Sequence, residues 1–167
     1  MEYLKISLNV IQIIVPFIIV GIVYLLWHKQ KGKEIIAGEA KDMLFKISQV
    51  VGHSSDILVL IMDSRFNANF RKGFEERLIT LKTIIEEFRH SSIFISEAKE
   101  DKELSDLTNE YWYNCMKTVD DYKRMFDKVT ANYQSSDDDK IIEIHNRIVN
   151  ASTTLKNRLY KIATYQD

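Results

Sequence analysis

The most apolar stretch of the chain is residues 6–27, ISLNVIQIIVPFIIVGIVYLLW, which carries no charged side chain over 22 positions. As an α-helix this stretch would be roughly 33 Å long at about 1.5 Å per residue, which matches a hydrocarbon core of about 30 Å. Tyr3 lies at one edge, and Tyr24 and Trp27 lie at the other, where aromatic rings favour the membrane interface. The stretch therefore predicts a single membrane-spanning helix.

The charges around this stretch predict its direction. Lys29, Lys31 and Lys33 follow the span, whereas the other flank offers Lys5 offset by Glu2. Because basic residues are retained on the cytoplasmic side of a membrane, we expect the N-terminus outside and the C-terminal part in the cytoplasm. The prediction is a single-pass protein of the inner (plasma) membrane.

A cleaved signal peptide is the alternative interpretation of the same stretch. Gly38 and Ala40 offer small residues of the kind found at cleavage sites. However, the apolar run exceeds the about 7 to 15 residues usual in such signals, and these small residues follow a basic stretch. A retained span is favoured.

Two amides interrupt the apolar stretch. Asn9 and Gln12 lie three residues apart on one helical face, and Pro16 lies four residues further on. Amides in hydrocarbon cost free energy unless they find a partner on another helix or line a wet cavity. Since a single span has no neighbour of its own, the partner would be another copy or another protein. Alternatively, both amides lie near the outer headgroups and are hydrated there. Pro16 removes one backbone donor and favours a kink.

The composition limits the remaining possibilities. The 167 residues hold 23 Lys and Arg against 24 Asp and Glu, for a net charge of −1. This balance gives no electrostatic reason to expect nucleic-acid binding. Cys115 is the single cysteine, so no intrachain disulfide forms. We divide the chain into an anchor with its basic flank, residues 1–30, and a cytoplasmic domain, residues 31–167.

The domain reads as helical throughout. One proline and five glycines in the whole chain leave the periodic segments almost uninterrupted. Steps of three and four residues between apolar positions predict four amphipathic helices, and hence an all-α protein with a four-helix bundle after the span. The four apolar stripes cover residues 36–61, 70–95, 104–133 and 141–162, with polar connectors at 67–69, 98–101 and 135–139. The first of these helices can continue directly from the span, with Gly32 between them and a bend at Gly52.

Several polar groups invite chemical interpretations that the sequence does not support. Glu87 and His90 match the Glu-x-x-His spacing of di-iron bundles, but no second copy of the motif exists. The acidic run 137–139 fits helix capping better than a cation site, because no calcium-loop pattern follows. We expect no metal ion and no cofactor.

Three other groups fit structural roles. His53, Ser54 and Asp56 include residue types used in nucleophilic catalysis, but neighbouring helical positions point in different directions and cannot form a triad alone. Cys115 falls on an apolar stripe and is expected to be a buried thiol. The aromatic run 111–113 covers more than one helical face, so at least one ring should lie outside the stripe.

A single N-terminal span followed by an all-helical cytoplasmic domain of this size resembles the small membrane protein that accompanies the type VI-B CRISPR RNA-guided ribonuclease. The resemblance covers the whole chain as an architecture. It implies a HEPN-like helical domain, ring-like assembly through the membrane, and antiviral defence by depolarising the host membrane. The HEPN signature, an Arg followed four to six residues later by His, is absent, and Lys140 ahead of His145 comes nearest. Lysine lacks the guanidinium fork, so no nuclease site is transferred.

The leading hypothesis is a non-enzymatic protein that associates with itself, with its spans gathered into a ring or pore and Asn9 and Gln12 toward the axis. Lys29, Lys31 and Lys33 would then form a basic ring that favours anions, or would simply orient the span. The expected partners are further copies, membrane lipid, and a CRISPR effector or other cytoplasmic protein.

Three alternatives remain open. The first is a membrane-tethered scaffold or regulator that binds a cytoplasmic partner. The second is a degenerate HEPN-like ribonuclease that uses Lys140, His145 and Arg147. The third is a lysis component, which would require the domain to lie outside the cytoplasm.

Overall fold

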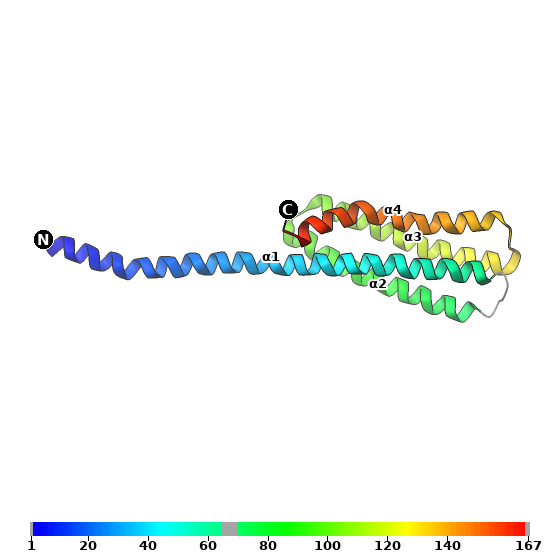
Figure 1. Cartoon of the computed structure of the whole chain (residues 1–167), viewed down its shortest axis with the longest axis horizontal. Helices are drawn as coiled ribbons and strands as arrows, with labels where there is room; N and C mark the ends of the chain where they lie inside the picture. Colours follow the sequence, from blue (N-terminus) through cyan, green and yellow to red (C-terminus); the bar gives the residue numbers. More distant parts are fainter. Residues whose placement is uncertain (1, 65–69, 166–167) are drawn as a thin grey trace. The chain divides into compact units, whose positions relative to one another are not determined.

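The computed structural model describes residues 2–64 and 70–165, with side chains from residue 14 onward. These residues form four helices and no strand (Figure 1). The helices are α1 (Glu2–Ser64), α2 (Arg71–Lys99), α3 (Lys102–Asn132) and α4 (Ser136–Ala163). The predicted all-α class is confirmed.

Helix α1 contains both the predicted span and the predicted first helix of the domain. It includes Pro16, Gly32 and Gly52 as helical residues. The predicted span and the first helix of the bundle are therefore one continuous helix, and the described chain has four helices in all. The sequence also allowed a separate spanning helix followed by four further helices. The chain divides into two compact units between Ile36 and Ala37.

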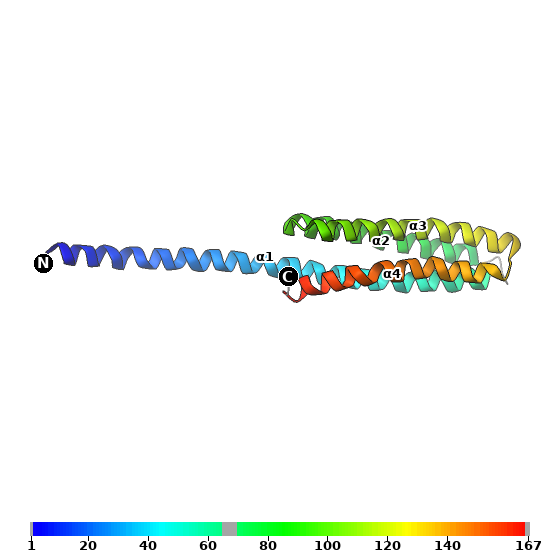
Figure 2. The same ribbon diagram turned by 90° about the horizontal axis from the view of Figure 1, so that it is seen from above.

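The second unit is a bundle in which neighbouring helices run antiparallel (Figures 1 and 2). Lys46 Nζ of α1 donates to Ser91 Oγ of α2 over 3.1 Å. Helices α2 and α3 meet where the Phe74 and Phe126 rings stack with centroids 4.1 Å apart. Within this unit, Figure 2 shows α2 beside α3 and α1 beside α4. The order is that of an up-down-up-down bundle.

The core consists of the apolar stripes that the sequence predicted. The largest fully buried side chains come from α1, α2 and α3 and include Met43, Phe88, Tyr111 and Tyr122. Leu155 and Leu159 of α4 are also fully buried. A few predicted core positions lie at the margin and are half-buried, namely Ile36, Phe70, Leu78, Leu107, Tyr133 and Ala151. Residues spaced by three and four lie on one face of a helix. Those at the middle of that face are buried in the core, and those at its edges are half-buried.

Two connectors are shorter than predicted. Helix α2 extends to Lys99 and ends on Glu100, which adopts a left-handed conformation with φ 52°. Asp101 then caps α3, accepting a hydrogen bond of 2.9 Å from the Leu104 backbone N–H. Helix α4 begins at Ser136, so most of the predicted 135–139 connector is helical. The predicted connector 67–69 lies outside the described residues.

Candidate membrane segment and polar contacts of the bundle

The side chains of residues 14–27 are all exposed on α1, and Phe17 is 75% exposed. By length and composition, α1 is the one helix of the described residues that is able to cross a membrane. A signal sequence near the N-terminus satisfies the same criterion. Pro16 lies within this exposed part of α1, whereas the side chains of Asn9 and Gln12 lie outside the described part of the chain.

Aromatic and basic side chains follow the apolar part of α1 in the order expected at a membrane interface. The His28 ring contacts Tyr24 edge-on, with centroids 5.1 Å apart, and Trp27 at 5.7 Å. Lys29, Lys31 and Lys33 are exposed. Lys31 lies 3.6 Å from Glu34, an exposed pair that contributes little to stability.

A buried cluster of hydroxyls and an imidazole joins three helices of the bundle. Ser54 Oγ of α1 lies 2.6 Å from the Tyr122 hydroxyl of α3 and 2.9 Å from His145 Nδ1 of α4. The Tyr122 hydroxyl also lies 3.2 Å from the Ser54 carbonyl oxygen, to which it can donate. Burial raises the pKa of Tyr122 to about 12 and lowers the pKa of His145. A neutral imidazole and two hydroxyls therefore satisfy one another.

This cluster includes the Ser–His pair that nucleophilic hydrolases use, but Ser54 is fully buried. Asp56, the acidic residue predicted nearby, points away and pairs with Arg77 of α2 at 2.6 Å. Ser54 and Asp56 therefore point in different directions, as predicted. Because substrate cannot reach a fully buried Ser54 Oγ, the cluster is suited to hold helices together.

The three residues of the suspected degenerate ribonuclease site have separate partners. Lys140 Nζ lies 3.7 Å from Asp137, His145 bonds to Ser54, and Arg147 pairs with Asp121 at 2.6 Å. Within residues 70–165 the three share no hydrogen bond or ion pair with one another. The contacts of His145 and Arg147 join α4 to α1 and α3, whereas the Lys140 pair lies within α4.

Asp137 lies in the first turn of α4, within the acidic run for which the sequence predicted helix capping. Its carboxylate is fully buried, bonds to Lys128, and accepts from the Gln134 backbone N–H at 3.1 Å. The hydrogen bond from Lys128 is the main reason why the pKa of Asp137 is lowered. The carboxylate thus accepts a backbone N–H, as predicted for the acidic run, but this N–H belongs to Gln134, which precedes α4. The hydrogen bond from Lys128 joins the same carboxylate to α3.

The other acidic and histidine residues form no metal centre in the described ranges. No three His, Cys, Asp or Glu side chains there are grouped so that they could hold an ion. Glu87 and His90, which matched the di-iron spacing, are both exposed on α2.

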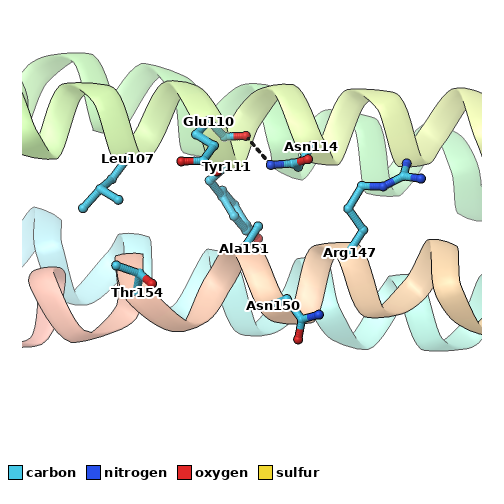
Figure 3. Close-up of a pocket in the computed structure, with 8 residues that line it drawn as sticks. All are labelled: Leu107, Glu110, Tyr111, Asn114, Arg147, Asn150, Ala151 and Thr154. Atoms are coloured by element: carbon cyan, nitrogen blue, oxygen red, sulfur yellow. Dashed lines mark hydrogen bonds between the residues drawn. The ribbon is translucent and has the colours of Figure 1, made fainter.

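A cleft of about 370 Å³ lies between α3 and α4 (Figure 3). Two of its polar side chains have partners within the chain, since Asn114 Nδ2 donates to the Glu110 carbonyl at 3.0 Å and Arg147 pairs with Asp121. The residues that line it are Leu107, Glu110, Tyr111, Asn114, Arg147, Asn150, Ala151 and Thr154. The sequence did not predict this cleft, since its sides come from two helices that only packing brings together.

The aromatic run of α3 divides between the core and the surface, as predicted. Tyr111 is fully buried with its ring edge-on to Phe88 at 5.0 Å, and burial raises its pKa. Trp112 carries the Arg89 guanidinium 3.9 Å from its ring centroid. Tyr113 is 62% exposed. Cys115 is buried, as expected, and burial raises the pKa of its thiol to about 12.

Two buried tyrosines should respond in opposite ways to loss of the hydroxyl. Tyr122→Phe removes the contacts with both oxygens of Ser54 and should lower the free energy of unfolding by about 1–3 kcal/mol. Tyr111→Phe should leave stability unchanged or raise it, because the Tyr111 hydroxyl has only the weak Cys115 thiol beside it. Urea denaturation followed by circular dichroism measures both, and equal losses would contradict the assignment.

Several polar side chains of the bundle thus join one helix to another, while the side chains of residues 14–27 on α1 are exposed. No protein-family model matches this chain, and no curated protein or solved structure matches it either.

Proposed function

We propose that this protein is a single-pass inner-membrane protein that holds a helical bundle at the cytoplasmic face and associates with further copies of itself. The observation that carries the proposal is the exposed, uncharged run of residues 14–27 on α1. An apolar surface of this size is unfavourable in water, and its natural environment is lipid or other spans. Lys29, Lys31 and Lys33 directly after it support a cytoplasmic bundle.

The self-association is proposed from the amides of the span. Asn9 and Gln12 in hydrocarbon gain hydrogen-bond partners when spans gather. If the spans surround an open axis, ions cross the membrane and the host loses its membrane potential. An antiviral role of this kind is what the resemblance to the CRISPR-associated membrane protein supports.

The contacts in the bundle support a structural rather than an enzymatic domain. His145 and Arg147, which a degenerate ribonuclease would need free for RNA, are bonded to Ser54 and Asp121. The bundle is therefore proposed to position the spans and to offer a surface to other proteins.

The test uses full-length protein with Asn9→Leu and Gln12→Leu together. The double variant should still enter the membrane, since it becomes more apolar, but should show weaker assembly in detergent and less loss of membrane potential. Val10→Leu with Ile13→Leu changes apolar neighbours only and serves as the matched control. An assembly and a leak equal to those of the wild type would contradict the role of the amides.

A further inference from the structure

The outward face of α1 in the bundle carries a regular apolar stripe that no other helix covers. Gly38, Phe45, Gly52 and Val59 follow one another at intervals of seven residues, and all four are exposed. They lie two residues, or about 200° around the helix, from a buried stripe of the same spacing. That buried stripe consists of Ala40, Ile47, Ser54 and Ile61, all fully buried. The exposed stripe, which we call the outer seam, is therefore directed away from the core.

Large side chains and glycines alternate along the outer seam, as they do on surfaces where helices pack together. Phe45 is 61% exposed and Val59 is 52% exposed, so two large apolar side chains stand out from the helix. A Cβ added at Gly38 or Gly52 would meet nothing within 4 Å, so the helix surface at these two glycines is open. Single exposed apolar residues are ordinary, but a seven-residue spacing keeps large and small positions on one face of α1, and it supplies one of the two positions per heptad by which helices pack along their length.

We infer that the outer seam is the contact surface for the outer seam of a second copy, with the two α1 helices parallel. This inference rests on the proposed self-association and extends it from the span to the bundle. Because both copies would cross the same membrane in the same direction, the inferred pair is parallel. Parallel packing on a two-fold axis places Phe45 against Phe45 and Gly52 against Gly52.

The charges beside the outer seam fit a copy of the same chain. Lys41 lies on one flank and Asp42 on the other, between the levels of Gly38 and Phe45. In a parallel two-fold pair opposite flanks meet, so Lys41 of each copy faces Asp42 of the second copy. Lys41 makes no ion pair with the residues that the structure describes, while Asp42 pairs with Lys46 at 2.6 Å and is half exposed. Between two copies, Lys41 would gain an acidic partner, and Asp42 would gain a second basic partner beside Lys46.

The stripe spans three heptads, a length that is marginal for two helices in solution. Confinement of both copies to one membrane raises their effective concentration and favours the contact. A two-fold contact closes after two copies. A larger ring would then be built from pairs joined through their spans and would contain an even number of copies.

The experiment is disulfide cross-linking of full-length protein in membranes, with one cysteine introduced at a time. The native Cys115 is buried and gives a low background. Cysteines at Gly38, Phe45, Gly52 and Val59 should form dimers on oxidation. Cysteines at Ile79, Tyr113 and Tyr160, which are equally exposed on the other helices, should stay near the wild-type background.

A second substitution tests the contact itself. Phe45→Glu lies on an exposed position, so the bundle should keep its helical circular dichroism. The two carboxylates would face each other, and cross-linking through Gly52→Cys should fall at least about tenfold. Cross-linking at the seam no stronger than at the control positions would overturn the inference. If the protein is still a discrete oligomer in detergent, the proposed self-association survives that result; if it is a monomer, both fail.

Discussion

Replacing both Ile19 and Val23 with lysine is expected to remove the protein from the membrane fraction. Both side chains are exposed on the apolar part of α1. A lysine near the centre of a spanning helix costs about 2.5–3.5 kcal/mol on insertion scales, so two of them oppose insertion by roughly 6 kcal/mol. The protein should then appear in the soluble or aggregated fraction after extraction of membranes at alkaline pH.

The matched control places the same charges on the bundle. Ile79→Lys with Ile93→Lys alters two exposed positions of α2 and should leave the protein in the membrane. The same fractions test the signal-peptide alternative. Cleavage near Gly38 would release the bundle, so a retained span predicts that the membrane-bound protein keeps its full mass. If the variant with two lysines in α1 fractionates with membranes as the wild type does, residues 14–27 are not the anchor.

The second large effect is expected near one end of the α2–α3 contact, close to the start of α2 and the end of α3. Phe126 is 1% exposed, stacks on Phe74, and has the Arg71 guanidinium 5.5 Å from its ring centroid. Phe126→Ala leaves a cavity in place of a ring, which typically costs about 3–5 kcal/mol of the free energy of unfolding. For a chain of this size the midpoint of thermal unfolding should fall by roughly 10 °C.

Tyr113→Ala is the control, because Tyr113 lies on the same helix with its ring exposed. Its loss should change stability by about 0.5 kcal/mol or less. Urea denaturation of both variants, followed by circular dichroism in detergent, measures the difference. A Phe126→Ala variant as stable as Tyr113→Ala would show that the two phenylalanines are not part of a packed core.

The helices could be predicted because their cause is local. Tyr111, Cys115, Tyr122 and Phe126 recur at helical spacing, and that period places them on one buried face of α3. The limits of the helices were less predictable: Ser136 and Asp137 are typical of a connector, yet both lie in α4. Asp137 could join the helix because Lys128, from another helix, compensates the burial of its charge.

The polar contacts could not be predicted because their members are distant in sequence. Ser54 meets Tyr122 and His145 across 68 and 91 positions, and nothing in the local sequence of any of them indicates the others. The outer seam shows the same limit. The stripe through Ile47 was predicted for the core and is buried, but the exposure of Phe45 and Val59 on another face of α1 is visible only in the packed bundle. The roles of Asn9 and Gln12 stay predictions.

The most direct test of self-association in the membrane is the mass of the full-length protein purified in mild detergent, with the bound detergent subtracted. Association predicts one discrete species of several chains, with an even number if the outer seam joins them in pairs. A single chain of 19.6 kDa at every protein concentration would contradict it.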